Sequence, residues 1–151
     1  MIYLTKNIIL SSLQNQDIAI AKNEILKINE ESSAYGLILT PNDVEDIIKS
    51  RGYTLKTYGR IDLNMDVTKK LINKIYKSQY TDKDDYVETI NDLQDIFYYL
   101  KNETLDKISD DEIIDLISEF YEETSGRIDN IQNLVEKYAL DFKLGRMNIY
   151  E

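Results

Sequence analysis

Carboxylates are the side chains best placed to do chemistry in this sequence. Residues 84–123 hold 14 of the 28 acidic residues, and seven of these fall on two helix faces at spacings of three or four. The first face consists of Glu88, Asp92 and Asp95, and the second of Asp111, Asp115, Glu119 and Glu122. Two such faces could together bind Mg²⁺ or Ca²⁺ through oxygen, as in a divalent-metal-dependent phosphohydrolase.

The apolar residues of both predicted helices lie on the side opposite these acids. Carboxylates that form a metal site in a helical bundle point inward, toward facing helices. We therefore favour a solvated acidic surface with no metal site, and we keep the phosphohydrolase as an alternative function.

Histidine and cysteine are both absent, with a count of 0 for each. No imidazole titrates near neutral pH, and neither a Ser-His-Asp nor a Cys-His site can form. Thiolate metal sites are excluded for the same reason. We expect no cofactor and no catalytic residue, and we therefore favour a protein that is not an enzyme.

Two arginines form the second candidate site. Arg51 lies on the apolar face of the helix predicted over residues 41–58, and a buried guanidinium requires a partner. Arg60 follows the end of that helix, and Glu103 is the predicted partner for either arginine. We favour a structural ion pair, with a small-anion pocket at Arg51 and Arg60 as the alternative.

Charge is distributed unevenly along the chain. Residues 1–83 carry 12 Lys+Arg and 10 Asp+Glu, a net +2, whereas residues 84–123 carry 2 and 14, a net −12. Lys70, Lys74 and Lys77 share one face of a predicted helix, so we expect them to meet the acidic segment within the fold or across a homodimer. Tyr99, on the acidic side of its helix, completes the candidate interaction face.

The net charge of −10 and the short apolar runs exclude some partners. Nucleic acid is disfavoured because phosphate binding needs a basic surface. No window approaches 18 apolar residues, so we expect no membrane partner, and the run Ile8–Leu10 is too short for a signal core. The absence of cysteine favours the cytoplasm.

Helical periodicity recurs along almost the whole chain, and only 5 Gly and 1 Pro interrupt it. It predicts an all-α single domain over residues 1–151, a bundle of six to seven helices with Phe97 in its core. The predicted helices cover residues 17–35, 41–58, 66–79, 82–105, 110–125 and 128–139. Residues 1–16 and 140–151 receive no assignment.

Local signals refine these boundaries. Thr40, Thr81 and Ser109 are the predicted N-caps, and Pro41 fits the first turn after Thr40. A short apolar run at 37–39 and a short alternating run at 61–63 could form one very short strand pair beside the helix over 41–58.

The segments GLILT at residues 36–40, Arg51, Gly59-Arg60 and FYYLKNE at residues 97–103 resemble a family of small bacterial proteins of unknown function, mostly from low-GC Gram-positive anaerobes. The resemblance covers about residues 36–118 and implies a bacterial cytoplasmic protein. It implies no activity, substrate or catalytic residue. Our leading hypothesis is a non-catalytic protein–protein interaction module, with the phosphohydrolase and the anion binder as alternatives.

Overall fold

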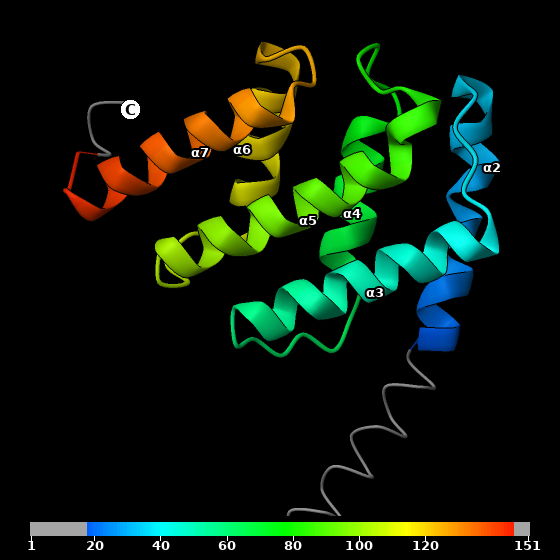
Figure 1. Cartoon of the computed structure of the whole chain (residues 1–151), viewed down its shortest axis with the longest axis horizontal. Helices are drawn as coiled ribbons and strands as arrows, with labels where there is room; N and C mark the ends of the chain where they lie inside the picture. The colour runs from blue at the N-terminus through cyan, green and yellow to red at the C-terminus, as the bar shows by residue number, and fades with distance from the viewer. Residues whose placement is uncertain (1–17, 147–151) are drawn as a thin grey trace, which may run out of the picture.

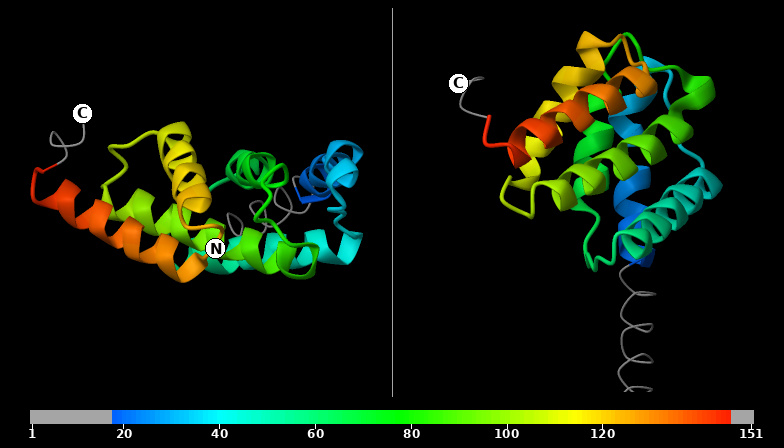
Figure 2. Two further views of the ribbon diagram at one scale, coloured as in Figure 1. Left: turned by 90° about the horizontal axis from the view of Figure 1, so that it is seen from above. Right: turned by 60° about the vertical axis from the view of Figure 1, so that its left-hand side comes forward.

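Helices alternate between two layers along the chain, in the part that the computed structural model describes, residues 18–146. One layer contains α3 (Pro41–Thr57), α5 (Tyr86–Glu103) and α7 (Ile128–Lys143). The other contains helical residues 18–27 with α2 (Asn29–Ser32), then α4 (Asp66–Ile75) and α6 (Asp110–Glu123), and it crosses behind the first (Figures 1 and 2). Two short 3₁₀ helices, η1 (Ser33–Tyr35) and η2 (Lys83–Asp85), lie where the chain passes from the second layer to the first, before α3 and α5 respectively. The all-α prediction is confirmed.

The core lies between the layers, with α5 at its centre. This helix contacts α3, α4, α6 and α7, and the apolar stripe along it is almost inaccessible to solvent, at Ile90, Leu93, Phe97 and Leu100. Full burial of such side chains contributes about 1.5–3 kcal/mol each. Phe97 also packs edge-on against Tyr98, with ring centroids 4.9 Å apart. The prediction that Phe97 belongs to the core is confirmed.

Two of the three predicted helix caps are present. Thr40 and Asp43 form a reciprocal capping box at the start of α3, and Ser109 Oγ accepts a hydrogen bond from the Glu112 amide at the start of α6. The prediction for Thr81 is wrong. Its hydroxyl donates instead to the Ile75 carbonyl at the end of α4, so α4 ends at Ile75, short of the predicted residue 79.

The predicted strand pair is also wrong, because side chains take the place of a second strand. Residues 18–146 contain no β-strand. Asn29 pairs with both backbone groups of Leu39 at 2.8 Å, and Ser32 Oγ donates to the Leu37 carbonyl. Side chains therefore satisfy hydrogen-bonding groups of this extended backbone that a neighbouring strand would otherwise bind. In the loop that follows α3, the Arg51 side chain does the same for two carbonyl groups.

None of the helices described between residues 18 and 146 combines the length and the apolar character needed to cross a membrane. The apolar run Ile8–Leu10 lies outside the described residues.

Candidate functional site

An open groove lies between helical residues 18–24, α3 and the loop that joins α3 to α4, and its volume is about 580 Å³. We call it the α3 groove. Buried apolar residues such as Ala21, Leu55 and Met65 contribute to its lining. Four further aliphatic lining residues are exposed, by 41% for Ile18, 59% for Ile20, 81% for Ile61 and 60% for Leu63. Clustered apolar exposure in a concave site is typical of a binding surface.

Arg51 holds the loop that forms one wall of this groove. It is only 9% exposed, and its Nη2 donates to the carbonyl oxygens of Asp62 at 2.6 Å and Asn64 at 2.7 Å. The Asp62 carboxylate lies 3.8 Å from the same nitrogen. Tyr98 donates its hydroxyl proton to the other Asp62 oxygen, and burial raises the pKa of Tyr98, which keeps this phenol a neutral donor. Arg51 thus fixes the segment that presents Ile61 and Leu63.

The end of α3 directs the chain into this loop. Gly59 has a φ of +64°, and the amides of Gly59 and Arg60 bond back to the carbonyls of Lys56 and Leu55, which is a Schellman motif. Arg60 Nη1 then donates to Asn102 Oδ1 of α5 at 2.6 Å, and its guanidinium also pairs with Asp106. The loop is therefore anchored to α5 at one end and to Arg51 along its length.

The opposite wall is held by two lysine–glutamate pairs. Lys69 of α4 binds Glu24 at 2.7 Å, and Lys22 binds Glu45 of α3 at 2.7 Å. The hydrogen bond that Lys69 donates to Glu24 raises the pKa of Lys69, so the lysine is charged at neutral pH. These contacts tie helical residues 18–27 to both layers and keep the groove open between them.

The predicted pairing of an arginine with Glu103 is wrong. Arg51 is buried and faces a carboxylate, but that carboxylate is Asp62, and Arg60 pairs with Asp106. Glu103 pairs with Lys143. The error arose because α7 continues to Lys143, past the predicted end at residue 139, and thereby supplies a cation beside the end of α5.

Tyr99 is half-buried against the core, although its place on the acidic side of α5 predicted an exposed side chain. α7 packs against α5 and covers this side. Burial raises the pKa of Tyr99, and the nearby Glu103 and Glu136 raise it further. Tyr99 therefore contributes to a contact inside the fold.

Lys70, Lys74 and Lys77 were predicted to meet the acidic segment within the fold or across a homodimer. Two of the three meet it within the fold. Lys70 binds Asp111 at 2.7 Å and Lys74 binds Asp115 at 3.0 Å, which joins α4 to α6. The hydrogen bond from Lys70 lowers the pKa of Asp111. Lys77 instead lies 5.6 Å from the centroid of the Tyr76 ring.

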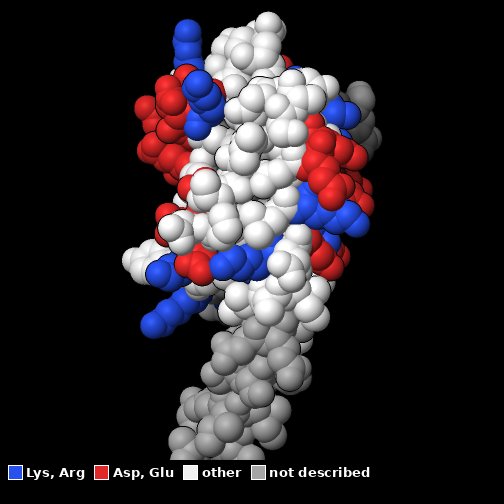
Figure 3. All heavy atoms as spheres, turned by 90° about the vertical axis from the view of Figure 1, so that its right-hand side faces the viewer, with Lys and Arg blue, Asp and Glu red and all other residues white. Residues whose placement is uncertain are grey.

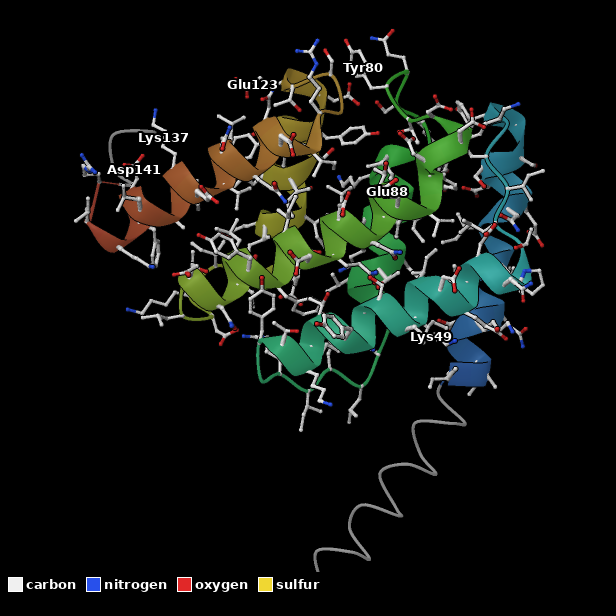
Figure 4. All side chains as sticks on the ribbon, viewed as in Figure 1. Lys49, Tyr80, Glu88, Glu123, Lys137 and Asp141 are labelled. Carbon is white, nitrogen blue, oxygen red and sulfur yellow. The ribbon has the colours of Figure 1, made fainter. Side chains whose placement is uncertain are left out.

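Apart from Asp92, the other acids of the predicted metal faces are exposed, as Glu88 on α5 illustrates in Figure 4. Asp92 is partly buried, and burial followed by the charges of Glu88 and Asp95 raises its pKa. Between residues 18 and 146, no three or more acidic side chains are grouped closely enough to hold a metal ion. The acids on α5 and α6 thus remain two separate surfaces in this part of the chain.

The α3 groove was not predicted from the sequence. Ile18 falls in the helix predicted over residues 17–35, and Ile61 and Leu63 fall in the run 61–63 that could form a strand, so the three were not placed together. One sequence signal could have indicated a binding surface. Ile61 and Leu63 form an aliphatic pair in a polar loop with no neighbouring apolar run to pack against. On the side formed by the N-terminal helices, a strip of uncharged side chains continues between charged margins toward the beginning of the described chain (Figure 3).

No curated protein and no solved structure matches the chain. A family model matches residues 24–148, a longer stretch than the resemblance over residues 36–118 and one that includes all of α7. On that match, the chain belongs to the family of unknown function DUF6323.

Proposed function

We propose that this chain is a non-catalytic cytoplasmic docking module that binds an apolar segment of a partner protein in the α3 groove. The observation that carries the proposal is the gathering of Ile18, Ile20, Ile61 and Leu63, all exposed, around one concave site. Covering each side chain contributes at most about 1.5–3 kcal/mol. The four side chains together therefore contribute at most about 6–12 kcal/mol, and part of this gain offsets the cost of association, so the groove supports a weak complex.

The lining suggests an amphipathic helix as the occupant. Apolar side chains lie within the groove, while Lys56, Asn64 and Asp66 supply polar groups of both signs beside them. A helix placing apolar residues at i, i+3, i+4 and i+7 into such a groove keeps its polar face in water. The mixed signs favour a partner segment of low net charge.

Gly52 supports the same interpretation. It lies inside α3 and lines the groove, and a Cβ added there would meet no atom within 4 Å. Glycine in a helix interior costs about 0.5–1 kcal/mol relative to alanine. Because Gly52 has no side chain, the α3 wall of the groove is lower at this position, and an occupant can approach the α3 backbone closely.

The two alternatives draw less support from the contacts. For a phosphohydrolase, Asp111 and Asp115 are already engaged by lysines. For an anion binder, the hydrogen-bonding Nη2 of Arg51 is engaged by loop carbonyls, and its Nε, which makes no hydrogen bond, is shielded from solvent. An anion in the groove would reach that nitrogen only after the loop had moved.

Affinity purification from cells that make the protein tests the proposal. The wild-type chain is compared with Leu63→Glu, in the groove, and with Leu140→Glu, a substitution at an exposed leucine of α7 outside it. We expect one or more proteins to be recovered with the wild type and with Leu140→Glu and lost with Leu63→Glu, at unchanged circular dichroism. Equal recovery with both variants would contradict docking in the groove.

A further inference from the structure

We propose that the segment docking in the α3 groove carries an acidic side chain beside its apolar anchors, and that Arg51 and Lys56 of α3 together bind its carboxylate. This inference rests on the proposed function and deepens it, because it names the chemistry by which the groove distinguishes one apolar segment from another. Both cations line the groove, and each has an N–H group without a partner in the part of the chain that the structure describes, residues 18–146.

Arg51 offers the first unpaired donor. The residue is 9% exposed, and its hydrogen bonds to the carbonyls of Asp62 and Asn64 are both made by Nη2. Its Nε is enclosed without a partner, whereas Nη1, which also makes no hydrogen bond to any described residue, is not enclosed. Because Arg51 lines the groove, Nη1 is the part of this guanidinium that an occupant can contact.

Lys56 offers the second donor. Ile48, Gly52 and Lys56 follow one another at a spacing of four residues, so they form one row along α3, and all three line the groove. Lys56 is exposed and forms no hydrogen bond or ion pair with the residues that the structure describes. Gly52 lies about 6 Å from Lys56 along the helix axis and is next to Arg51 in the chain. A carboxylate lying over Gly52, where no side chain blocks it, can therefore approach both cations.

The acids that line the groove are already engaged. Glu24 accepts a hydrogen bond from Lys69 at 2.7 Å, and Asp66 faces the same lysine at 3.7 Å. Asp62 accepts a hydrogen bond from Tyr98 at 2.7 Å. The charge that remains available to an occupant is therefore positive, although the whole chain carries a net −10. Charge complementarity favours an acidic group on the occupant over a basic one.

An apolar occupant without an acceptor would bind less well. It would remove water from Nη1 of Arg51 and from the ammonium group of Lys56, and it would leave both charged donors without a partner. A carboxylate between them restores charge-assisted hydrogen bonds, which are shorter and stronger than bonds between neutral groups. One acidic side chain also keeps the net charge of the segment low. The occupant is therefore an amphipathic helix with an acidic residue at the border of its apolar face.

Selection from a peptide library finds the preferred occupant without knowledge of the natural partner. Random peptides of about 16 residues, enough for about four helical turns, are displayed on phage with their C-termini fused, so that only side chains supply carboxylates. The library is selected on the full-length wild type and on Leu63→Glu, and peptides enriched on the wild type alone are the groove binders. We expect these to combine apolar residues at helical spacing with Asp or Glu at one fixed position.

Fluorescence anisotropy then measures how much the carboxylate contributes. The most enriched groove binder is synthesised with its acidic residue and with the matching amide, and both labelled peptides are titrated into the full-length wild type, Lys56→Ala and Lys49→Ala. Lys49, labelled in Figure 4, is an exposed lysine of α3 outside the groove lining. We expect the amide peptide to bind the wild type and Lys49→Ala about tenfold more weakly than the acidic peptide. On Lys56→Ala the difference should shrink to about threefold, because Arg51 is unchanged and supplies the remainder.

Four results would overturn the proposal. Groove binders with apolar spacing but no acidic position would show that the groove does not select a carboxylate, and they would leave docking itself intact. Equal affinity of the two peptides for the wild type, or an equal difference on all three chains, would show that Arg51 and Lys56 do not bind the carboxylate together. A difference abolished in Lys56→Ala would exclude Arg51 from the site. Absence of any groove binder would contradict docking in the groove as well, so the failures of the two proposals are distinguishable.

Discussion

Replacing Arg51 with methionine should destabilise the chain by about 3 kcal/mol. The guanidinium donates two hydrogen bonds, of 2.6 and 2.7 Å, to the Asp62 and Asn64 carbonyls. Hydrogen bonds from a charged donor contribute about 1.5–3 kcal/mol each, so their loss would cost about 3–6 kcal/mol. We take the lower end because this loop is partly exposed and water can replace the donor. Methionine keeps most of the apolar stem, so cavity formation adds little.

Urea unfolding, followed by circular dichroism, measures this loss. Arg60→Met is the comparison variant, because Arg60 pairs with the exposed Asp106, a pair that contributes about 0–1 kcal/mol, and donates one further hydrogen bond, to the Asn102 side chain. Both variants remove one guanidinium within the same loop region, and we expect the larger loss for Arg51→Met because it removes two backbone contacts of a buried guanidinium. The slope of unfolding free energy with urea should be unchanged.

A loss below about 1 kcal/mol for Arg51→Met, or one equal to that of Arg60→Met, would refute the reasoning that the Arg51 contacts hold the loop. A large loss of stability accompanied by unchanged partner recovery in the affinity purification would refute a second step, that Arg51 shapes the groove.

Three further predictions follow from the described contacts. Phe97→Ala should cost about 3–5 kcal/mol in urea unfolding, because the ring is fully enclosed, and a loss below about 1 kcal/mol would contradict its place in the core. Gly52→Ala should stabilise the chain by about 0.5–1 kcal/mol in urea unfolding but lower partner recovery in the affinity purification, whereas higher recovery would contradict the inference that Gly52 lowers the groove wall. Burial, and then the neighbouring Asp95, raise the pKa of Tyr58 from 10.0 to about 12, so the folded chain retains this proton longer than the unfolded chain. Its contribution to stability is complete below pH 10 and is lost as the pH rises through 12, and Tyr58→Phe should therefore show a shallower alkaline decline in unfolding free energy; an equal slope would contradict this.

Local sequence signals accounted for most of the helical framework. Thr40, Pro41 and Asp43 lie within four residues of one another, and their capping box depends on no distant contact. The apolar stripe of α5 likewise predicted which side of that helix is buried, because a helix has a fixed period. Thr81 shows the limit of this reasoning, since a long-range hydrogen bond with Tyr121 and the Ile75 carbonyl outweighed its capping preference.

The candidate site depended on long-range geometry and was less predictable. The position of Arg51 on an apolar face indicated burial, but no local rule could indicate that its partners would be carbonyls 11 and 13 residues later. The Glu103 prediction failed because the true end of α7 lies in a stretch without clear periodicity. The α3 groove brings residues 18–24 against α3 and the loop that follows it, and these parts are distant in sequence, so the groove became visible only once the layers were assembled.

Photo-crosslinking in cells that make the protein tests the central claim, docking in the α3 groove, most directly. A photoreactive phenylalanine derivative is placed at Leu63 in the full-length chain, and at Leu140 of α7 as the exposed control. The account predicts a discrete adduct with a second protein from position 63 and none from position 140. If position 63 gives no adduct, or both positions give the same adducts in equal yield, the α3 groove is not the docking site.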